Sequence, residues 1–171
     1  PDALGLSAGV PMIIGNTQHE TRSLIGESDP STFSLRWEDV PKRLVGEMRV
    51  DISPEIVVQV YRRLYPHYTP SDVFFAATTA ARSWRAAIVE AELRAQQGSP
   101  AYVYQLDWKS SRDGGKWGAH HTVDIPLVFD NAGSDERARR MAATMAGCFI
   151  PFAHTGNPSH PDIPQWTPYQ P

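Results

Sequence analysis

Residues 11–20 read Pro11-Met12-Ile13-Ile14-Gly15-Asn16-Thr17-Gln18-His19-Glu20, a short apolar run that ends in polar residues and a carboxylate. The unbroken apolar start predicts a strand over residues 12–14 that is covered on both faces, as in a parallel sheet. A second stretch reads Gly118-Ala119-His120-His121-Thr122-Val123-Asp124-Ile125-Pro126-Leu127-Val128-Phe129. It places a histidine beside another strand-like apolar run. These two stretches decide the expected fold.

Helical patterns surround a second strand. The aromatic and β-branched residues of 101–108 predict that strand. Helices are predicted over 37–48, over 54–64, from Pro70 to just before Gly98, and from about residue 134 to 155. The order of strand, helices, strand and helix is typical of an α/β architecture.

Local signals predict where the helices begin and which faces they bury. Ser53 before Pro54 indicates a capped helix start, and the residues Thr69-Pro70-Ser71-Asp72 resemble a capping box. The helix after Pro54 is predicted to bury Ile56, Val57, Val60, Tyr61 and Leu64. The long helix after Pro70 is predicted to run without interruption. One of its faces is formed by Val73, Ala77, Ala80, Trp84, Ala87 and Ala91.

Two strands are too few for a stable open sheet, because their edges need further partners. We therefore expect an α/β fold with a few parallel-type strands and covering helices that is incomplete as it stands. Residues 1–171 would form the C-terminal segment of a larger domain whose N-terminal part is absent.

An acid and a histidine come after the predicted strands. Functional residues in an open parallel sheet gather where the strands end at their carboxyl side. Glu20 and His121 are 101 positions apart (121 − 20), and their order matches the last two members of the hydrolase series Ser, Asp/Glu, His. A buried Glu20 would orient the imidazole, and His121 would take and return a proton.

The serine of such a triad is not evident. Gly5-Leu6-Ser7-Ala8-Gly9 matches G-x-S-x-G, but a nucleophile elbow needs a strand before it and a helix after it. Here a strand comes after the match, so we interpret Ser7 as a chance match.

Composition excludes several classes of protein. The 171 residues carry a net charge of −3, which argues against an electrostatic nucleic-acid binder. No apolar run is long enough to span a bilayer, so no membrane partner is expected. The single cysteine, Cys148, cannot form an intrachain disulfide and is predicted to be buried. The compartment stays unknown.

Four segments resemble the type-B carboxylesterase family, which has the α/β-hydrolase fold and includes cholinesterases and p-nitrobenzyl esterases. Residues 10–20 resemble the strand and acid turn of the family, and residues 118–129 resemble its catalytic-histidine motif. Residues 152–158 (Phe-Ala-His-Thr-Gly-Asn-Pro) resemble its late helix end, and residues 166–169 (Trp-Thr-Pro-Tyr) the tail. The likeness covers nearly the whole chain.

The resemblance implies a carboxylic ester hydrolase. Glu20 would be the catalytic acid and His121, rather than His120, the catalytic base, while the nucleophile and oxyanion hole would lie upstream. It implies a small-molecule ester substrate and no metal or organic cofactor. Three positions depart from the family pattern: His19-Glu20-Thr21 replaces Asp-Glu-Gly, and Thr122 stands where a glycine commonly follows the histidine.

Other interpretations of these residues stay open. His120 could line the substrate pocket or be structural, and Trp37 and Phe74 could line an acyl pocket, although helical spacing favours core packing. His120, His121 and Asp124 could suggest a metal, but adjacent histidines rarely converge on one ion. Asp124 would more readily make a supporting hydrogen bond. The alternative functions are a non-catalytic cholinesterase-like binding or adhesion protein, an inactive isolated fragment, a hydrolase that uses Ser7, and a metal hydrolase.

Overall fold

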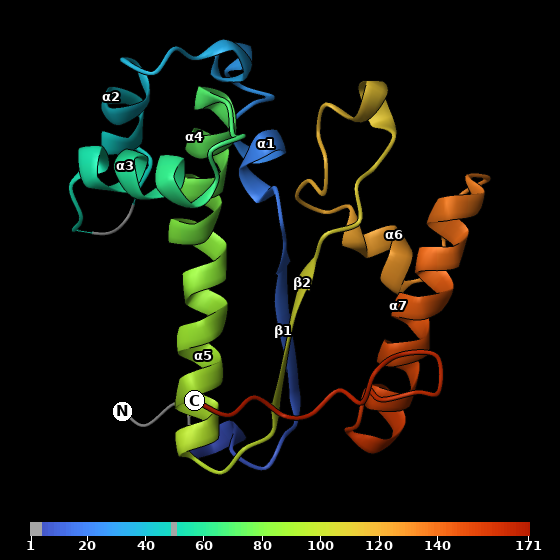
Figure 1. The fold of residues 1–171 in the computed structure, drawn as a ribbon. Coiled ribbons are helices and arrows are strands. Elements are labelled where there is room, and N and C mark those ends of the chain that lie inside the picture. Colours follow the sequence, from blue (N-terminus) through green and yellow to red (C-terminus); the bar gives the residue numbers. More distant parts are fainter. Residues whose placement is uncertain (1–4, 49–50) are drawn as a thin grey trace. The chain divides into compact units, whose positions relative to one another are not determined.

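The computed structural model describes residues 5–48 and 51–171 (Figure 1). The chain divides into two compact units. The first comprises the residues up to Asn16, Ala87–Trp108 and Thr122–Pro171, and the second comprises Thr17–Ala86 and Lys109–His121. Each unit has its own hydrophobic core.

The secondary structure is mostly helical with a small sheet, which confirms the predicted α/β class. The elements are η1 (Gly5–Ser7), β1 (Met12–Thr17), α1 (Glu20–Leu24), η2 (Pro30–Ser34), α2 (Val40–Val45), α3 (Pro54–Leu64), α4 (Pro70–Thr79), η3 (Ala80–Trp84), α5 (Arg85–Gln96), β2 (Ala101–Leu106), η4 (Arg112–Gly115), α6 (Asp124–Val128) and α7 (Glu136–Thr155). The segment η3 is a π-helix, and the other η segments are 3₁₀-helices. Over the described residues, no helix combines the length and apolar character that crossing a membrane requires.

The sheet of the first unit consists of β1 and β2, which lie side by side and run in the same direction (Figure 1). A Cβ atom at Gly15 would lie 2.3 Å from the ring of Tyr104, so only glycine permits this close approach. The prediction of a strand covered on both faces was wrong for residues 12–14, which are half-buried. Burial in β1 is complete only at its end, where Asn16 and Thr17 are 4% and 0% exposed.

The core of the first unit packs α6 and α7 together with β2. Leu106, Leu127 and Ala142 are buried there. The apolar residues after the histidines form the short helix α6 and not a strand-like segment. The last helix begins after Asp135, whose side chain accepts from two backbone N–H groups, and ends at Gly156 in the left-handed conformation.

The core of the second unit is formed by α2, α3 and α4 together with aromatic residues before α2. Val58 is the buried residue of α3, whereas Ile56 and Leu64 are 55% and 60% exposed. The predicted buried face of this helix was therefore partly wrong. The covered face includes Val58, which lies outside the predicted stripe, because packing in the core shared with α2 and α4 decides which face is covered and periodicity alone does not.

The long helix after Pro70 is interrupted. The predicted capping box is present at its start: Thr69 Oγ1 accepts from the Asp72 N–H, and the Asp72 carboxylate accepts from the Thr69 N–H. The predicted uninterrupted helix was wrong, because the π turn η3 separates α4 from α5. A π turn contains one more residue than an α turn. Trp84, the last residue of this turn, is 48% exposed, whereas the predicted face is buried before the turn at Val73 and Ala77 and after it at Ala87 and Ala91.

Two helix starts give a matched test of capping. The Thr69→Ala variant removes a cap hydrogen bond and should lower the free energy of unfolding by about 1 kcal/mol. Ser53 precedes α3 without a capping hydrogen bond and donates instead to Glu55. The Ser53→Ala variant should therefore lose less than about 0.5 kcal/mol. Urea unfolding of both variants measures the difference, and equal losses would contradict this account.

Candidate active site

Glu20 is the first residue of α1 and its carboxylate is buried. Its side chain is only 8% exposed. Oε1 accepts a hydrogen bond of 2.7 Å from the Thr17 N–H, and Oε2 lies 2.6 Å from His121 Nδ1. Both partners belong to the second unit, as Glu20 does. Each carboxylate oxygen therefore has a donor, which a buried carboxylate requires.

His121 ends the second unit, and its side chain is 48% exposed. A carboxylate oxygen at 2.6 Å accepts a hydrogen bond, so the proton of a neutral imidazole resides on Nδ1. The Nε2 atom then carries the free lone pair. An imidazole held in this tautomer by a carboxylate can accept a proton at Nε2 and return it.

Backbone hydrogen bonds bring the two segments together. The His19 N–H donates to the Ala119 carbonyl at 2.8 Å, and His19 and His120 form a parallel bridge. His120 is 9% exposed, and its Nδ1 lies 2.8 Å from the His121 carbonyl oxygen. The prediction that Glu20 and His121 lie near one another is therefore confirmed. The short extended pairing joins their two segments, which are about a hundred positions apart in the chain.

The position after the histidine has an unusual backbone. Thr122 has φ 70°, in the left-handed region that glycine adopts without strain. The departure from glycine noted in the sequence is therefore a real local conflict. A β-branched residue in this region costs about 1–3 kcal/mol, which the rest of the structure must supply.

The other candidate residues have contacts of their own. Phe74 is 1% exposed in the core of the second unit, and Trp37 packs against that core with the Arg62 guanidinium 4.4 Å from its ring. Their proposed pocket role, like that of His120, stays a prediction. Asp124 accepts a hydrogen bond of 3.0 Å from the Tyr104 hydroxyl.

Two further findings concern the alternative chemistries. Ser7 ends the 3₁₀-helix before β1, and Arg94 Nη1 donates to both its carbonyl and its hydroxyl oxygen at 3.0 Å. Within 5–48 and 51–171, no group of three or more His, Cys, Asp or Glu side chains is arranged to hold a metal ion.

Sequence reasoning missed the contacts that support the pair. The side chains of His19, Thr21 and Arg22, next to Glu20, all bind distant parts of the second unit. No local pattern could have identified them, because their partners lie 50 to 100 positions away.

Comparison with known proteins identifies the family. Residues 3–171 match the profile of the Carboxylesterase family, and the chain belongs to that family. The para-nitrobenzyl esterase of Bacillus subtilis (strain 168) is 26% identical over an alignment of 177 positions that covers 98% of this chain and 33% of that protein.

Solved structures show the same fold. A carboxylesterase of Geobacillus stearothermophilus superposes with a TM-score of 0.77 at 24% identity, covering 97% of this chain and 36% of that one. A PNB esterase gives a TM-score of 0.63 at 25% identity, covering 98% and 34%. The fold is thus that of part of an α/β-hydrolase, and the chain spans about a third of the length of these relatives.

The strain at Thr122 can be measured. The Thr122→Gly variant should raise the free energy of unfolding by about 1 kcal/mol, because relief of strain exceeds the added entropy of the unfolded chain. The Thr122→Ala variant keeps the Cβ atom and should gain less than about 0.5 kcal/mol. Chemical denaturation tests both, and a less stable glycine variant would overturn the assignment of strain.

Proposed function

We propose that the whole protein is a serine carboxylesterase in which this chain supplies the acid and the base of the triad. Glu20 is the acid and His121 the base, and the serine nucleophile and the oxyanion hole come from a preceding part of the protein. The observation that carries the proposal is the 2.6 Å contact between His121 Nδ1 and the buried Glu20 carboxylate. Membership of the Carboxylesterase family supports it.

The proposed reaction has two halves. His121 Nε2 takes the proton of the serine hydroxyl as its oxygen attacks the acyl carbon of the ester, and backbone N–H groups stabilise the oxyanion. The imidazolium then gives the proton to the leaving alcohol, which leaves an acyl-enzyme. Water, deprotonated by the same nitrogen, attacks the acyl carbon and releases the acid, and the serine recovers its proton. Glu20 stays ionised and stabilises the imidazolium.

Burial fits the proposed role of Glu20. A carboxylate with one oxygen on the Thr17 N–H and the other on His121 has a fixed orientation, so the imidazole is held in the tautomer that the reaction needs. The exposed half of the His121 side chain leaves the ring accessible to a nucleophile from elsewhere.

The test is made on the full-length protein with a chromogenic carboxylic ester. The His121→Ala variant should lower kcat by about three to six powers of ten, since it removes the proton acceptor. The Glu20→Gln variant should lower kcat by about a hundredfold or more while KM changes little. The control is His154→Ala, at an exposed histidine of α7. It should leave turnover within about twofold of the parent.

The outcomes separate the proposed function from its alternatives. A His121→Ala variant within tenfold of the parent would refute the assignment. A full-length protein that folds but hydrolyses no ester would favour the non-catalytic binding function.

The 171-residue chain by itself provides a second test. Fluorophosphonates label only an activated serine, and Ser7 lies before a strand and not in the strand-to-helix turn of a nucleophile elbow. We expect the intact mass of the treated chain to stay unchanged. A stoichiometric adduct mapped to Ser7 would contradict the proposal that the nucleophile comes from another part of the protein.

A further inference from the structure

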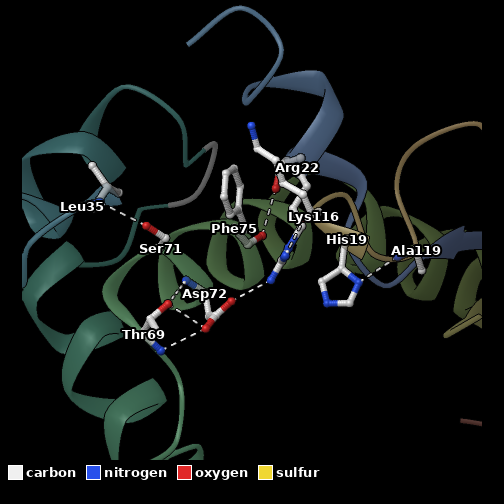
Figure 2. A network of polar contacts seen from close by, with 10 residues as sticks. His19, Arg22, Leu35, Thr69, Ser71, Asp72, Phe75, Lys116 and Ala119 are labelled. Carbon is white, nitrogen blue, oxygen red and sulfur yellow. Dashed lines mark hydrogen bonds and ion pairs between the residues drawn. The ribbon is translucent and has the colours of Figure 1, made fainter. Parts of the chain in front are cut away.

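Residues 19–22, which we call the acid turn, contain Glu20. Two of their side chains bind the backbone of residues 116–119, just before His121 (Figure 2). The ring of His19 accepts at Nδ1 a hydrogen bond of 3.2 Å from the Ala119 N–H. The guanidinium of Arg22 donates from Nη1 to the Lys116 carbonyl at 2.9 Å. His19 and Arg22 flank Glu20 in the sequence, and all these residues lie in the second unit.

Arg22 is fixed by a second anchor. Its Nη2 lies 2.6 Å from Asp72 Oδ1, and its side chain is 19% exposed. The other oxygen of Asp72 accepts from the N–H and the hydroxyl of Thr69 at 3.0 and 2.7 Å, in the capping box of α4 (Figure 2). The Arg22 guanidinium therefore connects Asp72, at the start of α4, to the backbone of residues 116–119. Another rotamer of Arg22 would lose both partners.

The segment that carries these side chains is itself held in place. Thr21 donates from Oγ1 to the Phe75 carbonyl at 2.9 Å, and Thr79 Oγ1 accepts from the Thr21 N–H at 3.3 Å. Thr21 and Thr79 are both buried. The turn is thus bound to α4, and it presents His19 and Arg22 from a rigid base.

The backbone at Gly118 passes very close to the His19 ring. Gly118 has φ +61°, and a Cβ atom there would lie 2.8 Å from His19 Nδ1. The imidazole therefore packs directly on the backbone two and three residues before His121. A side chain that contacts a backbone this closely controls where that backbone lies.

We propose that His19 and Arg22 are positioning residues for His121. Together they clamp the backbone of residues 116–119 so that His121 Nδ1 keeps its hydrogen bond to Glu20 while the imidazole exchanges protons. Neither residue touches the reacting atoms, and the inference rests on the proposed function of the Glu20–His121 pair. Displacement of a catalytic group by about 1 Å can cost about a hundredfold in rate, so a backbone clamp has a measurable effect.

The chain offers a matched control for the ion pair. Arg82 pairs with the Glu47 carboxylate, and its Nε donates to the Glu47 carbonyl at 3.3 Å. The two side chains are 25% and 32% exposed, compared with 19% and 30% for Arg22 and Asp72. Arg82 thus binds one carboxylate and one carbonyl, as Arg22 does. Its hydrogen bonds and ion pair within the described residues involve neither residues 19–22 nor residues 116–121.

The experiment measures kcat, KM and the free energy of unfolding of the full-length protein for Arg22→Met and Arg82→Met. Both variants should lose similar stability. Below the unfolding transition, Arg22→Met should lower kcat by about 10- to 100-fold with KM within about threefold, whereas Arg82→Met should stay within about twofold of the parent in kcat. Arg22→Lys should recover only part of kcat, because an ammonium group lacks the planar fork that reaches two acceptors.

The ring of His19 is tested by two substitutions. The His19→Asn variant keeps an acceptor oxygen near the position of Nδ1 and should retain most of kcat. The His19→Phe variant keeps a ring but has no acceptor, and its kcat should fall about tenfold or more. The low-field proton resonance of the His121 Nδ1–H should broaden or disappear in Arg22→Met and His19→Phe and persist in Arg82→Met.

Parallel measurements on His121→Ala and Glu20→Gln separate the two possible failures. If these two variants keep full turnover, the proposed function is wrong. If they lose turnover while Arg22→Met behaves as Arg82→Met does and His19→Phe as His19→Asn does, the proposed function stands and the clamp is refuted.

Discussion

The candidate site is held together by a short pairing of extended backbone, in which residues next to Glu20 bind residues that come about a hundred positions later. His19 pairs with Ala119 and His120 through its backbone, and this pairing places the segment of Glu20 beside the segment of His121. Closing so long a loop costs entropy that a few hydrogen bonds do not recover. The ring of Phe33 lies 4.9 Å from that of Phe75 and 5.4 Å from that of Trp117 between centroids, so aromatic contact also joins the segment before His121 to α4.

The buried Glu20 carboxylate restricts the arrangement of the site further, because it needs hydrogen-bond donors. A charge that is largely removed from water must find donors in the protein, and here it has one backbone N–H and one imidazole. The absence of either donor would leave a partly unsatisfied carboxylate, so the site favours the arrangement in which both are present. Order at the site is therefore a consequence of burying the acid.

Strong local signals predicted much of the fold, and long-range contacts account for the features that those signals missed. The capping box at Thr69, the two strands and the helix that ends at Gly156 arise from short patterns with a direct physical cause. The exposure of Ile56 and the partial exposure of residues 12–14 in β1 do not follow from such patterns, because burial depends on which neighbours cover a face. The proximity of Glu20 and His121 was predicted from chain order and family resemblance. The supporting contacts of His19 and Arg22 could not be predicted, since a side chain that binds a distant backbone N–H or carbonyl leaves no periodic trace.

The π turn η3 has a consequence for how this chain can change over evolution. An uninterrupted helix transmits its side-chain phase, so inserting one residue at one end would rotate every later side chain by about 100°. The five residues Ala80–Trp84 accommodate one such extra residue within a single turn, next to the point where the units divide at Ala86. The extra residue is confined to this turn, and α4 and α5 on either side are regular α-helices. A helix can therefore take up an insertion of one residue within a single turn without losing its regular geometry before or after it.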